Sequence, residues 1–244
     1  MGREVLSAAR ERGDEVVLAV SRSGRGEFDG VEIEPASEFG ALLEAREPEA
    51  AIDFTVPEAS VDYVDACAEA GVPAVVGTTG FDDADLAALR DASARIPILK
   101  AANFARGVQG LLEVVRAAVE ALPGYDVEVT ETHHNGKRDA PSGTANRVLD
   151  AIDEARAVEG ERVHGREGEA PRESGEIGVH ARRAGDITGE HEVLLADNHE
   201  ELRLTHRAES RGVFAAGALD AADWIAGHVP GWYDFSDVLA DSST

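Results

Sequence analysis

The alternation of apolar and polar positions divides the first part of the chain into short strands and amphipathic helices. Continuous apolar runs predict strands buried on both faces, at residues 16–20, 50–54, 72–77 and 96–99. Apolar residues at helical spacing predict helices at residues 2–12, 59–70 and 82–92. Strands interleaved with helices of this length predict an α/β fold with a doubly wound parallel sheet.

The pattern changes after residue 103. A predicted amphipathic helix at 108–122 precedes residues 125–132, where Val127 and Val129 alternate with polar side chains, as in a strand with one buried face. Further strands are predicted at 177–182, 191–196 and 201–206, and further helices at 144–157 and 213–226. Residues 159–174 are rich in Gly, Glu and Arg and predict a mobile loop or lid.

These patterns predict three segments. Residues 1–103 form a Rossmann-like dinucleotide-binding domain. Residues 104–213 form an inserted α+β domain with an open mixed sheet. Residues 214–244 return to the first domain.

The charge balance excludes some partners. The chain has 48 acidic and 23 basic residues and a net charge of -25, so we expect it to bind neither nucleic acid nor an anionic membrane. Acidic residues spread along the whole chain indicate either a halophilic acidic surface adapted to molar salt or an ordinary acidic protein. Cys67 is the only cysteine, and no apolar run is long enough for a membrane span. We therefore expect a cytoplasmic protein.

The segment 131–145 has the residues best suited to chemistry. His133 and His134 offer imidazoles that titrate near neutral pH, at the end of a predicted strand. Lys137 supplies an ammonium group in a chain whose only other lysine is Lys100. Residues 142–144, Ser-Gly-Thr, begin a predicted helix, where backbone N–H groups and hydroxyls suit a carboxylate. Together they predict a pocket for a dianionic substrate that is protonated during the reaction.

Each of these features also has an ordinary structural interpretation. A histidine pair at a strand end is often a polar surface pair, and Ser-Gly-Thr before a helix is often only a helix cap. Zinc is a further alternative, but adjacent strand residues point to opposite faces, and we expect no metal. Its candidate ligands are His133, His134, His180, His191 and His206.

The same segment resembles a known family. His133-His134, Lys137 and Asp139-Ala140-Pro141-Ser142-Gly143-Thr144-Ala145 are similar to the motif of the 4-hydroxy-tetrahydrodipicolinate reductases, also called dihydrodipicolinate reductases. Further blocks follow in the family's order, at residues 53–55, 76–81, 101–104, 183–191, 204–211 and 214–218. The resemblance implies NAD(P)H-dependent reduction of 4-hydroxy-tetrahydrodipicolinate to tetrahydrodipicolinate in lysine biosynthesis. It also implies a homotetramer, with residues 104–213 as the substrate-binding and oligomerisation domain.

The resemblance also implies roles for individual residues. His133 would be the general acid, and Lys137 would oppose the charge of a small dicarboxylate substrate. The other implied substrate-binding residues are His134, Ser142, Gly143 and Thr144. The implied cofactor-binding residues are Gly77, Thr78, Thr79, Ala101, Ala102, Asn103 and Phe104, and the sequence after the run at 16–20 adds Arg22 as a candidate. Because no acidic residue follows the run at 16–20 and Arg22 does, we expect NADPH to be favoured over NADH.

The chain departs from the family at its first residues. The family begins with a strand and a Gly-rich phosphate loop, whereas Met1-Gly2-Arg3 matches only the end of that loop. We expect an N-terminally truncated sheet, explained either by a true start further upstream or by a real truncation. Two other functions stay open: a non-catalytic remnant or assembly partner of the same fold, and another two-domain dehydrogenase.

Overall fold

The computed structural model describes residues 1–24 and 26–241. Its elements, in order, are α1 (Gly2–Arg12), β1 (Ala19–Ser21), β2 (Gly26–Phe28), β3 (Val31–Pro35), η1 (Ala36–Glu38), α2 (Phe39–Arg46), β4 (Ala51–Asp53), α3 (Pro57–Ala70), β5 (Ala74–Val76), α4 (Asp83–Ala92), β6 (Pro97–Lys100), α5 (Arg106–Ala121), β7 (Asp126–His133), α6 (Gly143–Arg156), β8 (Arg162–His164), β9 (Ile177–Arg183), β10 (Gly189–Asp197), β11 (Glu200–Ala208), α7 (Gly212–Ile225), β12 (Gly231–Tyr233) and α8 (Phe235–Asp241). They pack into two compact units, Met1–Ala105 with the C-terminal residues from Arg211, and Arg106–Ser210. The sequence pattern placed the corresponding boundaries after residues 103 and 213.

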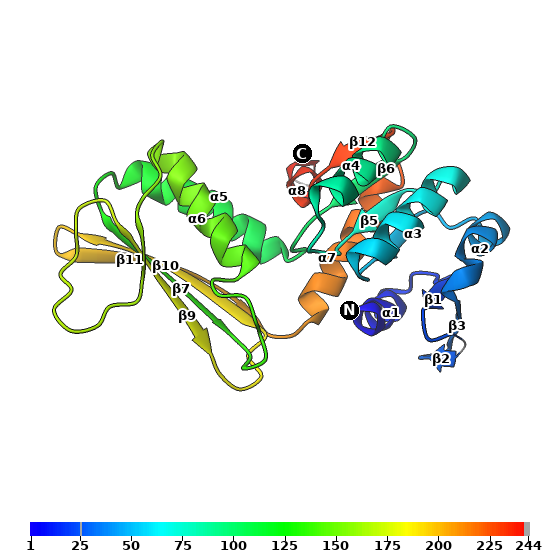
Figure 1. Ribbon diagram of the computed structural model, residues 1–244, viewed down its shortest axis with the longest axis horizontal. Helices are drawn as coiled ribbons and strands as arrows, with labels where there is room; N and C mark the ends of the chain where they lie inside the picture. Colours follow the sequence, from blue (N-terminus) through cyan, green and yellow to red (C-terminus); the bar gives the residue numbers. More distant parts are fainter. Residues whose placement is uncertain (25, 242–244) are drawn as a thin grey trace. The chain divides into compact units, whose positions relative to one another are not determined.

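The first unit has the expected α/β architecture, with its strands in two sheets (Figure 1). Strands β12, β6, β5 and β4 lie side by side in that order, and every neighbouring pair is parallel. Strands β1 and β3 are parallel in a second sheet, and β2 pairs antiparallel with β3. Within the described residues no strand ladder joins the two sheets, so the parallel strands are divided between them.

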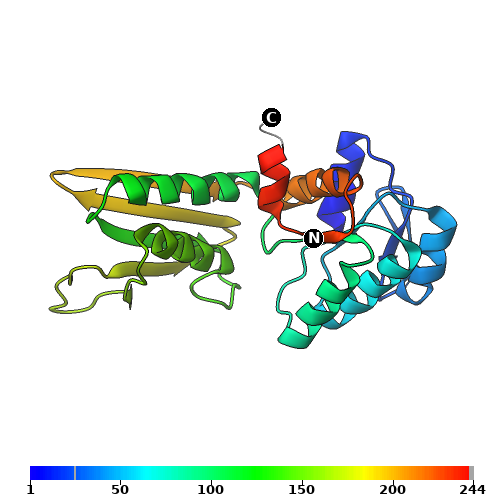
Figure 2. The same ribbon diagram turned by 90° about the horizontal axis from the view of Figure 1, so that it is seen from above.

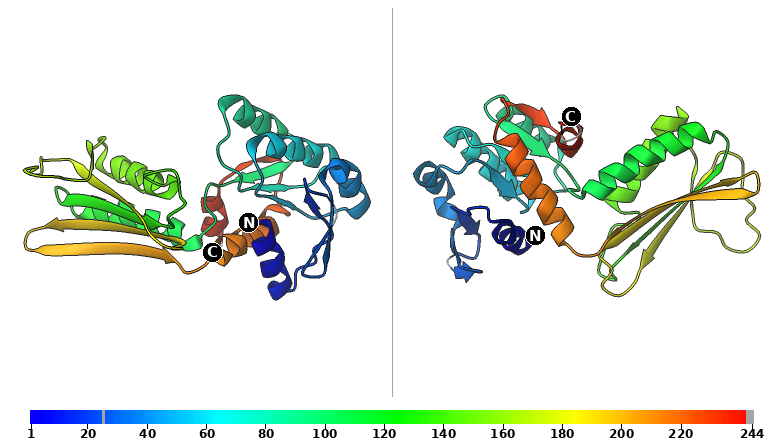
Figure 3. Two further views of the ribbon diagram at one scale, coloured as in Figure 1. Left: turned by 60° about the horizontal axis from the view of Figure 1, so that its bottom comes forward. Right: turned by 180° about the vertical axis from the view of Figure 1, so that it is seen from behind.

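Both faces of the larger sheet are buried. Neighbouring residues of β5 point to opposite sides, so Val75 packs in a cluster with α7 and Val76 in a cluster with α3 and α4. Leu99 and Ile98 of β6 divide in the same way. Helix α1 lies beside α7 (Figure 3), where Arg12 pairs with Asp220 and Asp223. Helices on both faces explain why these strands are continuous apolar runs.

Local sequence sets the helix ends. Pro57 occupies the first turn of α3, and Gly71 ends that helix in a left-handed conformation with φ of 72°. Asp82 and Asp85 form a reciprocal capping box at the start of α4. None of the helices in the described part of the chain has the length and apolar character needed to cross a membrane.

Some expected strands and loops were wrong in extent. The strand expected at 16–20 is β1, which begins only at Ala19, because its partner β3 pairs from that point. The expected loop at 159–174 contains β8, which pairs with β9 at the edge of the second sheet. Short elements such as β2, β3 and β12 were not predicted, since three to five residues give little periodic signal.

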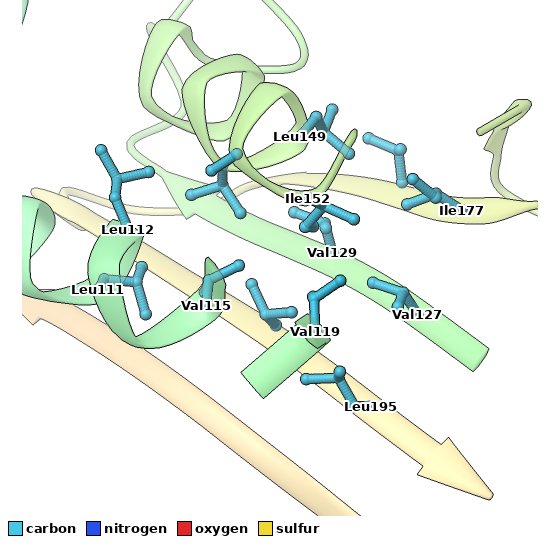
Figure 4. Packing of buried hydrophobic residues seen from close by; sticks show 14 residues of the cluster. Leu111, Leu112, Val115, Val119, Val127, Val129, Leu149, Ile152, Ile177 and Leu195 are labelled. Carbon is cyan, nitrogen blue, oxygen red and sulfur yellow. The ribbon is translucent and has the colours of Figure 1, made fainter. Parts of the chain in front are cut away.

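The second unit is an open mixed sheet with helices on one face (Figure 2). The strand order is β11-β10-β7-β9-β8, with β10 antiparallel to both neighbours and β7 parallel to β9. Leu111 and Val115 of α5 and Leu149 of α6 pack on Val127 and Val129 of β7 (Figure 4). This core fixes β7 in the middle of the sheet, and the candidate site lies at its carboxyl end.

Candidate functional site

The candidate site begins on the buried face of β7. Residues two apart on a strand share a face, so Glu131 and His133 continue the row of Val127 and Val129 that packs under the helices. Glu131 is fully buried, and the His133 residue is 9% exposed. A carboxylate in this position needs hydrogen-bond and charge partners, because burial of an unpaired charge is costly.

Glu131 accepts four hydrogen bonds from three residues. Its Oε1 accepts from Arg183 Nη2 at 2.7 Å and from the Ser142 backbone N–H at 3.1 Å. Its Oε2 lies 2.8 Å from Arg183 Nη1 and 2.6 Å from His133 Nδ1. Burial acts to raise the pKa of Glu131, but the hydrogen bonds from Arg183 and His133 outweigh it and the pKa is lowered. The carboxylate is therefore ionised and bound bidentately by the guanidinium.

His133 is held between β9 and β10. Arg183 of β9 is its register partner, and the ring of His191 from β10 packs edge-on against it with centroids 5.2 Å apart. Burial lowers the pKa of His133, and the nearby charges of Lys137 and Arg183 act in the same direction. Glu131 acts in the opposite direction, through both its hydrogen bond and its charge.

Ser142 and His191 support the start of α6. The Ser142 hydroxyl accepts from the backbone N–H of Ala145 and lies 3.0 Å from His191 Nε2. Burial lowers the pKa of His191 to about 3, so this imidazole is neutral. Ser142 is 2% exposed, and its hydroxyl is engaged inside the protein as a helix cap. The structure therefore places this predicted substrate-binding side chain beneath the site surface.

The turn after β7 carries the other predicted residues. Lys137 Nζ lies 2.8 Å from Asp139 Oδ1, and the Lys137 backbone N–H donates to the carbonyl of His134. His134 is half-buried over this turn, where its ring lies near Gly136. Hydrogen bonds from Lys137 and from backbone N–H groups lower the pKa of Asp139 despite its partial burial.

Gly143 and Thr144 form the first turn of α6, the N-terminal end of a helix of 14 residues. Gly143 is exposed and Thr144 is half-buried. Backbone N–H groups in a first helical turn favour negative charge. The turn and the helix start thus bring an ammonium group and backbone donors close to one another in sequence and in structure.

The predicted cofactor residues lie in the first unit. Gly77, Thr78 and Thr79 follow β5, and residues 101–104 follow β6, so both groups lie at the carboxyl edge of the larger sheet. This edge is where open parallel sheets bind ligands. Arg22 follows β1 in the other sheet and is exposed.

Several of these side chains have structural partners. The Thr78 hydroxyl donates to Asp53 Oδ2 at 2.8 Å, and Asp53 also accepts from the hydroxyls of Ser60 and Thr55. A Cβ on Gly77 would meet the ring of Phe54 at 2.2 Å, so glycine is required there by packing. Phe104 is 1% exposed and packs edge-on against Phe54 at 5.7 Å between centroids.

Other predicted cofactor residues remain accessible. Thr79 and Ala102 are exposed, and Asn103 is half-buried with its side-chain oxygen accepting from the backbone N–H of Ala105. Ala101 is buried, and its N–H donates to the carbonyl of Val76. As for a metal, residues 1–24 and 26–241 bring no three His, Cys, Asp or Glu side chains together as ligands.

Sequence reasoning gave no role in the site to Glu131 or Arg183, and it considered His191 only as a candidate zinc ligand. The alternation on β7 contained a signal for Glu131, because residues two apart on a strand face the same side and Glu131 therefore lies on the same face as the buried Val127 and Val129. Arg183 and His191 had no comparable signal, since their position depends on how β9 and β10 align with β7.

Two family models match nearly the whole chain. The model for the dihydrodipicolinate reductase N-terminus matches residues 1–104, and the model for its C-terminus matches residues 107–239. The chain belongs to the dihydrodipicolinate reductase family.

Close relatives agree with this membership of the family. The chain is 60% identical over 98% of its length to a protein of Natronomonas pharaonis named 4-hydroxy-tetrahydrodipicolinate reductase, covering 95% of that protein. It is 54% identical over 98% of its length to a protein of the same name from Haloarcula marismortui, covering 94% of it.

A solved structure of the family agrees in fold. The dipicolinate-bound dihydrodipicolinate reductase from Paenisporosarcina sp. TG-14 matches 96% of this chain and 92% of its own, with a TM-score of 0.77 at 23% identity. At this identity the likeness concerns the fold, namely a parallel sheet with helices on both faces and a second unit built on a mixed sheet.

Proposed function

We propose that this chain reduces 4-hydroxy-tetrahydrodipicolinate to tetrahydrodipicolinate, with hydride from NAD(P)H and a proton from His133, in lysine biosynthesis. Replacing the ring hydroxyl by hydrogen consumes one hydride and one proton and releases one water. The single observation that carries the proposal is the buried pair of Glu131 and His133, 2.6 Å apart, beside a turn that presents Lys137. Membership of the family and the name of its 60% identical relative support it.

His133 would act through its Nε2 atom. Its Nδ1 is engaged with Glu131, which leaves the other ring nitrogen to carry and release the proton. The side chain is 11% exposed, enough for solvent to restore the proton after each turnover. Bringing a dianionic substrate next to this ring opposes the effect of Lys137 and Arg183, and so raises the pKa of His133 when the proton is needed.

The negative charges of the substrate would be held by the turn and the helix start. Lys137 offers an ammonium group, and the first turn of α6 offers the backbone N–H groups of Gly143 and Thr144. His134, half-buried over the same turn, would add a further donor. Ser142 would contribute by capping the helix and keeping these donors in place.

The carboxyl edge of the larger sheet suits a nicotinamide group. The half-buried ring of Phe54 and the buried ring of Phe104 form an apolar base, while Thr79, Ala102 and Asn103 lie nearer the surface. A flat apolar base with a few polar groups around it is typical of sites for such rings. When bound, the cofactor supplies the hydride.

The remaining predicted residues would hold the rest of the dinucleotide. Gly77, Thr78 and Ala101 would act through their backbone or through packing, since the Thr78 hydroxyl is bound to Asp53. Arg22 is exposed after β1, and a guanidinium there favours the 2′-phosphate of NADPH. The proposal includes preference for NADPH over NADH, a homotetramer and a cytoplasmic location.

The test is consumption of NADPH or NADH with freshly generated substrate, at several salt concentrations. We expect turnover with both cofactors and a lower KM for NADPH, and His133→Gln should lower kcat by about 10²- to 10⁴-fold with little change in KM. Normal turnover by this variant would show that the proton comes from another group. A folded chain that binds neither cofactor nor substrate would overturn the proposed function, and light scattering would test the tetramer.

A further inference from the structure

Three imidazoles lie on the helix-covered face of the second sheet, yet only one has a carboxylate partner. His191 is the register partner of both His206 on β11 and Glu131 on β7, and His133 packs against the His191 ring. Burial lowers the pKa of all three imidazoles, that of His191 to about 3. Only His133 has a hydrogen bond to Glu131 that opposes the effect of burial.

The charge state of Glu131 fixes the position of the proton on His133. An ionised carboxylate only accepts hydrogen bonds, so at 2.6 Å the His133 Nδ1 must donate to it. Neutral His133 therefore has its hydrogen on Nδ1, and Nε2 is the nitrogen that gains and loses the second proton. Nε2 lies against Gly189, where an added Cβ would be 3.1 Å away, so the ring edge that exchanges protons lies over a residue without a side chain.

Arg183 limits how strongly Glu131 acts on the imidazole. Its guanidinium binds both carboxylate oxygens, at 2.7 and 2.8 Å, and also donates to the carbonyl of Asp139. Without a cation the fully buried carboxylate would hold the imidazolium tightly, which is unfavourable for a group that must release its proton. With Arg183 in place, the charge of Glu131 is shared among the guanidinium, the imidazole and the Ser142 backbone N–H.

We propose that Glu131 is a positioning residue that selects His133 as the proton donor and fixes its Nε2 as the donating atom, and that Arg183 weakens its hold on the proton. The proposal deepens the proposed function and rests on it. The charged and titratable groups that face His133 are Glu131 on its own strand, Arg183 on β9, His191 on β10 and Lys137 in the following turn.

Glu131 and Arg183 shift the pKa of His133 in opposite directions, so replacing each of them should shift the titration midpoint of His133 in a different direction. Glu131 raises the pKa of His133 and Arg183 lowers it. Glu131→Gln should therefore lower the midpoint of the His133 titration, and Arg183→Met should raise it. A merely structural role for the pair predicts no such opposite shifts, because loss of packing alone does not depend on the sign of the charge removed.

The experiment follows the histidine rings by NMR of the full chain, with ¹⁵N-labelled histidine. In the unaltered protein we expect the neutral His133 ring to have its hydrogen on Nδ1. In Glu131→Gln the amide can donate to Nδ1 instead, so a large share of rings should change to the Nε2 form. The matched control is Glu128→Gln on the same strand, since Glu128 lies 2.6 Å from His180 of β9 and its replacement should leave His133 unchanged.

Activity is measured in parallel. We expect Glu131→Gln to lower kcat about 10- to 100-fold with less than a threefold change in KM. This loss of kcat is smaller than the loss of about 10²- to 10⁴-fold expected when the general acid itself is removed. If Glu131→Gln does not fold, the double variant Glu131→Gln with Arg183→Met removes both charges and still tests the ring form.

The outcomes separate this proposal from the proposed function. An unchanged His133 ring form in Glu131→Gln overturns the positioning role, whatever the activity. A raised midpoint in Glu131→Gln, or a lowered one in Arg183→Met, overturns it as well. Absence of cofactor consumption by the unaltered chain, together with the predicted NMR changes, would refute the reductase function and leave the proton selection standing.

Discussion

Gly189→Ala should reduce turnover with little change in stability. The added Cβ would lie 3.1 Å from Nε2 and 3.3 Å from Cδ2 of His133, so the imidazole must move by a few tenths of an ångström. The ring cannot move freely, since its Nδ1 is held 2.6 Å from Glu131. A misplacement of about 1 Å costs about 10²-fold in rate, so a shift of about 0.5 Å costs about tenfold, or roughly 1.4 kcal/mol.

Stability should change little. Gly189 does not have a positive φ, so alanine is compatible with the backbone and restricts the unfolded chain, which stabilises by about 0.4–1 kcal/mol and offsets the cost of the close contact between the Cβ and the held ring. The assay is kcat and KM for cofactor consumption, with the unfolding midpoint of each variant. Gly110→Ala is the control, because Gly110 is exposed on α5 with no atom within 4 Å of the added Cβ. Unchanged kcat in Gly189→Ala, while His133→Gln is inactive, would refute the placement of Nε2.

Three further predictions concern other parts of the molecule. Asp139→Asn should free Lys137 from its 2.8 Å ion pair and lower KM for a dianionic substrate a few-fold, more so at low salt; a raised KM would contradict this. Gly217→Ala should destabilise the first unit by about 1–3 kcal/mol in chemical denaturation, because the Cβ would overlap the carbonyl oxygen of Phe104. Cys67 should resist alkylation at pH 8 in the folded chain, since burial raises the pKa of its thiol to about 12; rapid labelling would show local opening.

Much of the fold follows from periodicity. The α/β architecture, the helices at 2–12, 59–70 and 82–92, and the change to a one-faced sheet were all predicted from apolar spacing. The pairing of the strands was not predicted, because paired strands are far apart in the sequence and local spacing does not show which of them are neighbours. The division of the parallel strands into two sheets also depends on pairing, and it shortened the strand expected at 16–20 to β1.

In the site, too, local features were predicted from the sequence and contacts between strands were not. The motif at 133–145 predicted the turn, the cation and the start of α6, because these lie within one short stretch. It also predicted a role for Ser142 next to the substrate, whereas the structure uses this hydroxyl as a helix cap. The partners that set the proton affinity of His133 come from β9 and β10, whose register with β7 no local pattern reveals.

Strand β7 shows why a histidine motif does not by itself define an acid. Each of its two glutamates makes a 2.6 Å contact with a histidine, Glu131 with His133 of the same strand and Glu128 with His180 of β9. The first pair is 0% and 11% exposed in its side chains, and the second is 26% and 34% exposed. Solvent screens the second pair, so its carboxylate has less influence on the imidazole. Each glutamate also has an arginine partner, Arg183 for Glu131 and Arg172 for Glu128. Burial under α5 and α6 is therefore what suits the first pair to proton transfer.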